Sequence, residues 1–171
     1  MAPTGYQWFP ISRLDPGEMQ RGVESAAGLL DAFLDTELDR LGLPHDRLAL
    51  VGFSQGTMMS LQVGLRRPVK PAAIIGYSGM LARGTELEPL PPDTPPILMV
   101  HGGADPMIPA DAMLASVGIL GGAGAAVQWH ISPGVGHGID PVGLDLGGSF
   151  LSAAFRGLLR RREPVISSSV P

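Results

Sequence analysis

Residues 47–59 read RLALVGFSQGTMM and contain the turn around which the predicted fold is arranged. An apolar run leads into Gly52-Phe53-Ser54-Gln55-Gly56, and a helical pattern follows. This order predicts a strand, a sharp turn at Ser54 and a helix, the context in which a G-x-S-x-G motif presents a nucleophilic serine. A Gly-rich turn in which Ser54 only caps the helix would contain the same residues. The nucleophile is therefore a hypothesis that needs partner residues elsewhere.

The composition predicts a single folded domain. Of 171 residues, 44% are hydrophobic and 16% are charged, which favours a buried core over disorder. We expect one domain over residues 1–162 and a frayed tail over residues 163–171. The net charge of -4 and a longest basic run of three arginines, 160–162, argue against a nucleic-acid partner.

The sequence also bears on location and on cysteine chemistry. It contains no cysteine, so it offers neither a disulfide nor a thiolate metal site. No apolar run approaches the roughly 18 residues of a membrane-spanning helix, and the first residues lack the pattern of a secretory signal. We therefore expect a cytoplasmic protein without a membrane span.

A long amphipathic helix is predicted between Asp15 and Gly42. Asp15-Pro16-Gly17-Glu18 combines an N-cap, a proline at the first helical position and an acid three residues after the cap, and Gly42 with Pro44 ends the helix. Apolar residues recur at spacings of three and four, as expected of a helix that packs on a core. They are Met19, Val23, Ala26, Leu30, Phe33, Leu34, Leu38 and Leu41.

The remaining elements alternate between helix and strand. After the Ser54 turn we expect a helix to about Arg67, with two arginines at the negative end of its dipole, buried-type strands over residues 72–79 and 96–102, and a further strand over residues 127–131. Further helices are expected over residues 109–120 and 150–159. This alternation predicts an α/β fold with a mainly parallel sheet flanked by helices, in which functional groups gather at the carboxyl ends of the strands.

Two such groups follow predicted strands. Asp105 comes just after the strand at 96–102, and His137 just after the strand at 127–131. A serine becomes a good nucleophile when an imidazole takes its proton, and a carboxylate on the other ring nitrogen orients that imidazole. Ser54, Asp105 and His137 supply these groups in the chain order Ser, Asp, His that α/β-hydrolases use.

Each partner also has a purely structural explanation. Asp105, in Ala-Asp-Pro, is equally explained as a turn residue, whereas a histidine between two glycines, as at 137, is less easily a core residue. We expect His101 to close its strand and support the Asp105 loop, His130 to lie in a strand and His45 in a turn. The four histidines lack metal-ligand spacing, so we expect no metal and no cofactor.

The segments around these residues resemble the phospholipase/carboxylesterase group of α/β-hydrolases, which includes acyl-protein thioesterases and small bacterial carboxylesterases. The similar segments are residues 6–9, 52–56 and 77–79, His101-Gly102 with Asp105 and Ile108-Pro109, and Gly136-His137. The resemblance implies an α/β-hydrolase fold with Ser54, Asp105 and His137 as catalytic triad. It further implies Gln55 as a backbone N-H donor to the oxyanion and a small-molecule acyl ester or thioester as substrate.

One part of the family pattern has no counterpart. Members begin with further strands and a His-Gly loop that gives the second oxyanion donor, and nothing before Tyr6 corresponds to them. The run Leu48–Phe53 is apolar on both faces, as in a central strand, yet no comparable strand precedes it. We therefore expect an N-terminally truncated domain, with Met1 internal to a longer reading frame and the second donor missing.

Two functions from different classes follow. The first is a serine hydrolase that cleaves carboxylic esters or thioesters through an acyl-enzyme, with a lactone hydrolase or a peptidase as rivals within the enzyme class. The second is a catalytically impaired fragment or a non-catalytic chain that completes its sheet with another polypeptide. We favour the hydrolase. The exposed sheet edge would also allow a homo-oligomer.

Overall fold

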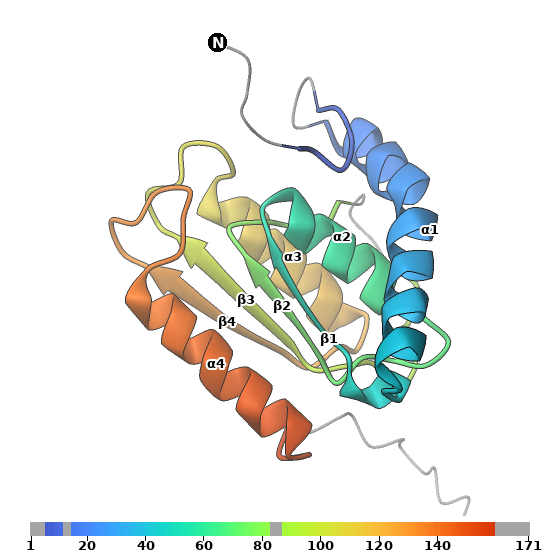
Figure 1. Ribbon diagram of the computed structural model, residues 1–171. Helices are drawn as coiled ribbons and strands as arrows, with labels where there is room; N and C mark the ends of the chain where they lie inside the picture. Colours follow the sequence, from blue (N-terminus) through green and yellow to red (C-terminus); the bar gives the residue numbers. More distant parts are fainter. Residues whose placement is uncertain (1–5, 12–14, 83–86, 160–171) are drawn as a thin grey trace, which may run out of the picture.

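A computed structural model describes residues 6–11, 15–82 and 87–159. After a long first helix, strands and helices alternate along the chain (Figure 1). The elements are α1 (Pro16–Leu41), η1 (His45–Arg47), β1 (Ala49–Phe53), α2 (Gln55–Gly64), β2 (Ala73–Tyr77), β3 (Ile97–Gly102), α3 (Ala110–Gly122), β4 (Val127–Ser132) and α4 (Pro141–Phe155). The predicted tail, 163–171, lies outside the described residues.

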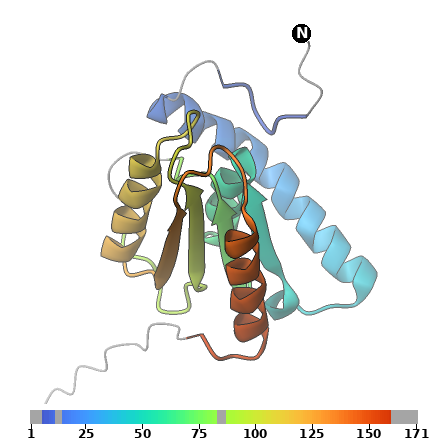
Figure 2. The ribbon, with the colours of Figure 1, turned by 90° about the vertical axis from the view of Figure 1, so that its left-hand side faces the viewer.

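The sheet lies between two layers of helices, as predicted. Its four described strands are parallel and follow the order β1-β2-β3-β4. Helices α2 and α3 pack on one face and α4 packs on the other, while α1 packs against α2 (Figures 1 and 2). Side chains of β2 alternate between these layers: Ile74 belongs to the core beside α3, and Ile75 to the core beside α4. The α/β prediction is confirmed.

The first helix begins and ends where the sequence predicts. The Asp15 carboxylate accepts a hydrogen bond from the Glu18 N-H, and Gly42 ends the helix in the left-handed conformation. The predicted apolar face is only partly buried, because Phe33 and Leu41 are 58% and 55% exposed. The spacing of apolar residues identifies the face of a helix that packs on the core. It does not show how much of that face the neighbouring elements cover.

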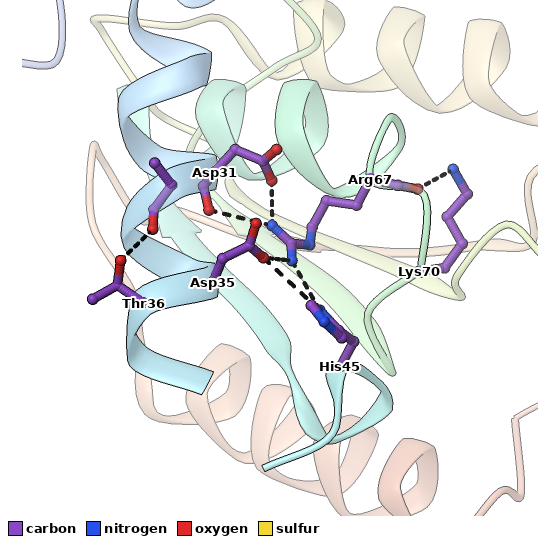
Figure 3. A network of polar contacts seen from close by, with 7 residues as sticks. Asp31, Asp35, Thr36, His45, Arg67 and Lys70 are labelled. Atoms are coloured by element: carbon purple, nitrogen blue, oxygen red, sulfur yellow. Dashed lines mark hydrogen bonds and ion pairs between the residues drawn. The ribbon is translucent and has the colours of Figure 1, made fainter. Parts of the chain in front are cut away.

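Helix α2 is shorter than predicted, and Arg67 has a different role from the one expected. The helix ends at Gly64, so Arg67 does not belong to its last turn. The Arg67 side chain is 3% exposed, and its guanidinium binds the carboxylates of Asp31 and Asp35 on α1 and lies 3.1 Å from His45 Nδ1 (Figure 3). The network joins α1 to the segment after α2. Ion pairing, rather than the helix dipole, thus accounts for this arginine.

Helix α4 starts nine residues before the predicted helix of 150–159. Asp140 caps it by accepting a hydrogen bond from the Gly143 N-H at 3.0 Å, and Pro141 is its first residue. Its glycines weaken the helical signal, since glycine costs about 1 kcal/mol relative to alanine in a helix. Gly147 has a packing reason: an added Cβ would lie 1.8 Å from the Tyr77 hydroxyl oxygen on β2.

Within the described residues, β1 forms one edge of the sheet. Leu50 and Gly52 are buried on the α2 side, whereas Val51 and Phe53, on the other side, are 54% and 41% exposed. Helix α4 packs on β2, β3 and β4. The predicted apolar, unpaired edge is therefore present in the described part of the chain. None of the described helices has the length and apolar character needed to cross a membrane.

The contact between Gly147 and Tyr77 gives a stability test. Gly147→Ala forces a methyl group into the space of the Tyr77 hydroxyl, so we expect the free energy of unfolding to fall by about 1–3 kcal/mol. Gly148→Ala is the matched control, because an added Cβ there meets nothing within 4 Å. It should raise stability by a few tenths to about 1 kcal/mol through helix propensity. Equal effects of the two substitutions in urea unfolding would contradict the packing.

Candidate active site

Ser54 lies in a strained turn between β1 and α2. Its φ of 54° and ψ of -116° belong to a region that a residue with a side chain rarely adopts, at a cost of about 1–3 kcal/mol. The Ser54 N-H donates to the Tyr77 carbonyl oxygen at 2.9 Å, which ties the turn to the end of β2. Surrounding contacts maintain this strained backbone conformation. The turn places the serine at the carboxyl end of the strand.

Close backbone contacts allow this turn. A Cβ on Gly52 would lie 2.2 Å from the Gly56 carbonyl group, and one on Gly79 would lie 2.4 Å from Thr57 Cβ. The buried Thr57 hydroxyl lies 3.0 Å from the Gly52 carbonyl oxygen and 2.9 Å from that of Tyr77, and donates to them. Gly52 of the motif and Gly79 after β2 thus allow the close crossing of strand and helix, whereas a Cβ on Gly56 would meet nothing within 4 Å.

Asp105 and His137 lie in direct contact. The loops after β3 and β4 carry them, and His137 Nδ1 lies 2.8 Å from Asp105 Oδ2. The His137 ring also packs on Phe53, with ring centroids 4.9 Å apart, so it lies beside the residue that precedes Ser54. The described residues contain no hydrogen bond between Ser54 and His137. In unliganded sites such bonds are often long and shorten when substrate binds.

The Asp105 carboxylate is buried and well supplied with donors. Its Oδ1 accepts hydrogen bonds from the N-H groups of Met107 and Ile108, at 2.8 and 3.0 Å, while Oδ2 faces His137. Burial by itself raises the pKa of Asp105, but the bonds from His137, Ile108 and Met107 outweigh it and hold the pKa below the ordinary 3.8. The group therefore remains a carboxylate that can stabilise an imidazolium.

His101, near the end of β3, supports the loop that carries Asp105. Its side chain is fully buried, and Nε2 lies 2.8 Å from the Ile108 carbonyl oxygen and 3.3 Å from Asp105 Oδ2. Both neighbours of Nε2 are acceptors, so Nε2 is the nitrogen that donates here, and Nδ1 has no partner among the described residues. In the described ranges, no group of three or more His, Cys, Asp and Glu side chains is arranged to hold a metal ion.

The loop that carries His137 is fixed at both ends. On one side, the buried Ser78 hydroxyl donates to the Gly138 carbonyl oxygen at 2.8 Å. On the other, the Ser132 hydroxyl donates to Asp140 at 2.8 Å, and this bond is the main cause of the lowered pKa of Asp140. Sequence reasoning missed these supports. Ser132 and Asp140 bracket the loop, but their spacing does not show that they meet.

A pocket of about 520 Å³ opens beside Ser54. Its walls are largely apolar and come from three parts of the chain: the segment before α1, the Ser54 turn with its following helix, and the loop after β3. They include Trp8, Ile11, Phe53, Met58, Met107 and Ile108. The sequence did not indicate that the segment at 6–11 would line a pocket next to the serine. The arrangement can hold an apolar group against a nucleophile.

Comparison with known families shows to which family the chain belongs. The family model described as phospholipase/carboxylesterase matches residues 1–154. The chain belongs to the phospholipase/carboxylesterase family. The resemblance found in the sequence is thereby confirmed.

Curated relatives of this family member include thioesterases and esterases. Acyl-protein thioesterase 1 of Gibberella zeae is 31% identical over 156 residues, which cover 84% of this chain and 66% of the relative. Esterase YpfH of Escherichia coli is 29% identical over 141 residues, which cover 81% of this chain and 58% of the relative. The chain thus spans less than two thirds of the length of either relative.

Solved structures show the same fold. Esterase PE8 aligns with a TM-score of 0.76 and 35% identity, covering 92% of this chain and 72% of that one. SOBER1 of Arabidopsis thaliana aligns with a TM-score of 0.72 and 24% identity, covering 87% of this chain and 74% of that one. Together with the parallel sheet flanked by helices, these likenesses establish the α/β-hydrolase fold for this phospholipase/carboxylesterase family member.

The charge on Asp105 predicts how acid affects the folded protein. Because its pKa is lower in the folded state than its ordinary value of 3.8, it contributes stability above about pH 4 that is lost as the pH falls through the folded value. Asp105→Asn removes this contribution. The free energy of unfolding should therefore fall less steeply in the variant than in the wild type between about pH 5 and 3.

Asp93→Asn is the control, because Asp93 is an exposed loop residue. It should leave the acid dependence close to that of the wild type. The same slope for the Asp105 variant and the wild type in urea unfolding would contradict the charged network around Asp105.

Proposed function

We propose that the protein is a serine hydrolase that cleaves carboxylic esters or thioesters through an acyl-enzyme. The observation that carries the proposal is the 2.8 Å hydrogen bond between His137 Nδ1 and the buried Asp105 carboxylate, beside the strained turn of Ser54. The names of the relatives, thioesterase and esterase, support the same class of reaction. Ser54 would be the nucleophile, His137 the general base and Asp105 the group that orients it.

The first step forms a covalent bond between Ser54 Oγ and the acyl carbon. His137 Nε2 takes the hydroxyl proton as Oγ attacks, and the Asp105 carboxylate stabilises the imidazolium. The bond from the acyl carbon to the alcohol or thiol then breaks, and His137 returns the proton to that leaving group. The Asp105 bond to Nδ1 leaves Nε2 directed away from the acid, as this proton transfer requires.

The second step releases the acid. Water attacks the acyl-enzyme while His137 takes its proton, and Ser54 recovers that proton as the acyl-oxygen bond breaks. In both steps negative charge develops on the carbonyl oxygen. The backbone N-H of Gln55, the first residue of α2, has no intrahelical acceptor and would donate to that oxygen. That a second oxyanion donor is missing stays a prediction.

The pocket beside Ser54 supports an acyl ester or thioester with an apolar group as the small-molecule substrate. Its apolar walls bury such a group, and each buried methylene contributes about 0.8 kcal/mol. We also propose that the protein acts without a cofactor, because the three side chains supply a nucleophile, a base and its orienting acid. A cytoplasmic location remains part of the same proposal.

Substitution of the three residues tests the mechanism. With nitrophenyl acetate as substrate, Ser54→Ala should lower kcat by roughly 10⁴ to 10⁶, and His137→Ala nearly as far, since the two act as a unit. Asp105→Asn should lower kcat on the order of 10⁴-fold, because it favours the wrong tautomer of His137.

Ser152→Ala is the control, because Ser152 is an exposed serine on α4. It should retain the wild-type rate, and circular dichroism should show all four variants folded. Hydrolysis that survives Ser54→Ala intact would refute the nucleophile.

The exposed edge of β1 favours a second candidate function. Val51 on this edge strand is half-exposed, and unpaired N-H and C=O groups of such a strand can pair with another chain. In this alternative the protein is a non-catalytic or impaired chain that completes its sheet with another polypeptide, including a second copy of itself.

Size-exclusion chromatography tests the alternative. If β1 pairs between copies, the wild type should elute as an oligomer, and Val51→Lys should shift it toward the monomer, since charge on an edge strand opposes pairing. Val69→Lys, at a half-exposed valine in the loop after α2, is the control. A monomeric wild type that hydrolyses esters would exclude the alternative.

A further inference from the structure

The segment at 6–11 forms a wall of the pocket without belonging to a helix or strand. Phe9 anchors it: the side chain is 4% exposed and belongs to the core formed by α1 and α2. The anchor also depends on Gly22 of α1, where an added Cβ would lie 2.2 Å from the Phe9 ring. Trp8, which faces the pocket, is 43% exposed. Burial therefore holds Phe9 far better than it holds its neighbour.

The side chain of Gln55 bonds to this segment at two points. The Trp8 N-H donates to Gln55 Oε1 at 3.0 Å, and Gln55 Nε2 donates to the Phe9 carbonyl oxygen at 2.9 Å. The carboxamide thus pairs with an N-H and a C=O of the segment, as a neighbouring strand would. Only one orientation of the carboxamide matches a donor with an acceptor at both points, so the pair of bonds specifies the position of the segment.

Gln55 is also the residue directly after Ser54. It begins α2, and the strained turn of Ser54 fixes its backbone. A side chain anchored there places the Trp8 wall relative to the serine, while Phe9 fixes the same segment on α1. The mechanism uses only the backbone N-H of Gln55, so the bonds of its side chain need a separate explanation.

We propose that the Gln55 side chain is a positioning residue that holds the Trp8 wall of the pocket in register with Ser54 and so sets the preference for long acyl groups. This inference rests on the proposed function for its substrate and on the two hydrogen bonds for its structure. A short acyl group reaches little of the wall, whereas a long one contacts it along its length. Loss of the two bonds therefore costs long substrates more than short ones.

The test compares nitrophenyl octanoate with nitrophenyl acetate. Gln55→Met retains the length of the side chain without its hydrogen bonds, and it should lower the ratio of kcat/KM for octanoate to that for acetate by about tenfold. Gln55→Glu retains the acceptor for the Trp8 N-H but opposes the Phe9 carbonyl oxygen, so it should lower the ratio as well. It also serves as the second variant if Gln55→Met is poorly folded.

Tryptophan fluorescence gives a readout that needs no catalysis. In a Trp129→Phe background, where Trp8 is the remaining tryptophan, Gln55→Met should increase acrylamide quenching and lower the anisotropy of Trp8. Gln20→Met is the matched control, because the Gln20 side chain on α1 donates through Nε2 to the Glu24 side chain at 3.0 Å and bonds to no other side chain in the described part of the protein. It should change neither the quenching nor the substrate ratio.

The two readouts separate the possible failures. Unchanged quenching in both Gln55 variants would overturn the inference, whatever the activity. Increased quenching with an unchanged substrate ratio would overturn the role in acyl preference. A wild type that hydrolyses neither ester would refute the proposed function, and the quenching comparison would then decide by itself whether Gln55 holds the wall.

Discussion

The candidate site depends on the buried carboxylate of Asp105. Two backbone N-H groups, of Met107 and Ile108, fix one oxygen, and His137 bonds to the other. His101 reaches the same carboxylate from the end of β3. A buried carboxylate without partners would be costly, so these donors both stabilise its charge and define its position. The acid thereby joins the loops after β3 and β4 into one unit.

A constrained backbone conformation places Ser54 near this unit. Parallel strands bring their carboxyl ends to the same edge of the sheet, and β1 ends there in a turn with a positive φ. The hydroxyl of Thr57 and the carbonyl oxygen of Tyr77 hold that turn against β2. Contact between the Phe53 and His137 rings brings the serine turn and the base loop together across the sheet. Strain of a few kcal/mol at Ser54 is thus balanced by contacts with its neighbours.

Local signals explain what could be predicted from the sequence. Apolar runs ended by glycine or proline indicated the four strands, and an N-cap with proline indicated α1. Because functional groups follow such strands, Ser54, Asp105 and His137 could be named as candidates, and the resemblance to a family supported them. The start of α4 was missed because Gly143 and Gly147 weaken its helical pattern, although both lie where the helix approaches the sheet.

Contacts between distant residues could not be predicted in the same way. Arg67 meets Asp31 across 36 residues, and Gln55 meets Trp8 across 47. No period or motif in the sequence marks either pair, because the contacts depend on how α1 and the segment before it lie against α2 and the residues after it. The same holds for Ser78, whose bond to Gly138 joins the end of β2 to the loop after β4. Side-chain bonds of this kind position the site, and they become visible only when the layers of the fold are assembled.

The central claim is that Ser54 is an activated nucleophile, and covalent labelling tests it most directly. A fluorophosphonate reacts with a serine whose proton a neighbouring base removes, and it leaves ordinary serines unmodified. Intact-protein mass spectrometry with peptide mapping should find one adduct, on Ser54, in the wild type and in Ser152→Ala. The adduct should be absent in Ser54→Ala and form far more slowly in His137→Ala. Labelling that persists in Ser54→Ala, or that proceeds at the wild-type rate without His137, would contradict the account.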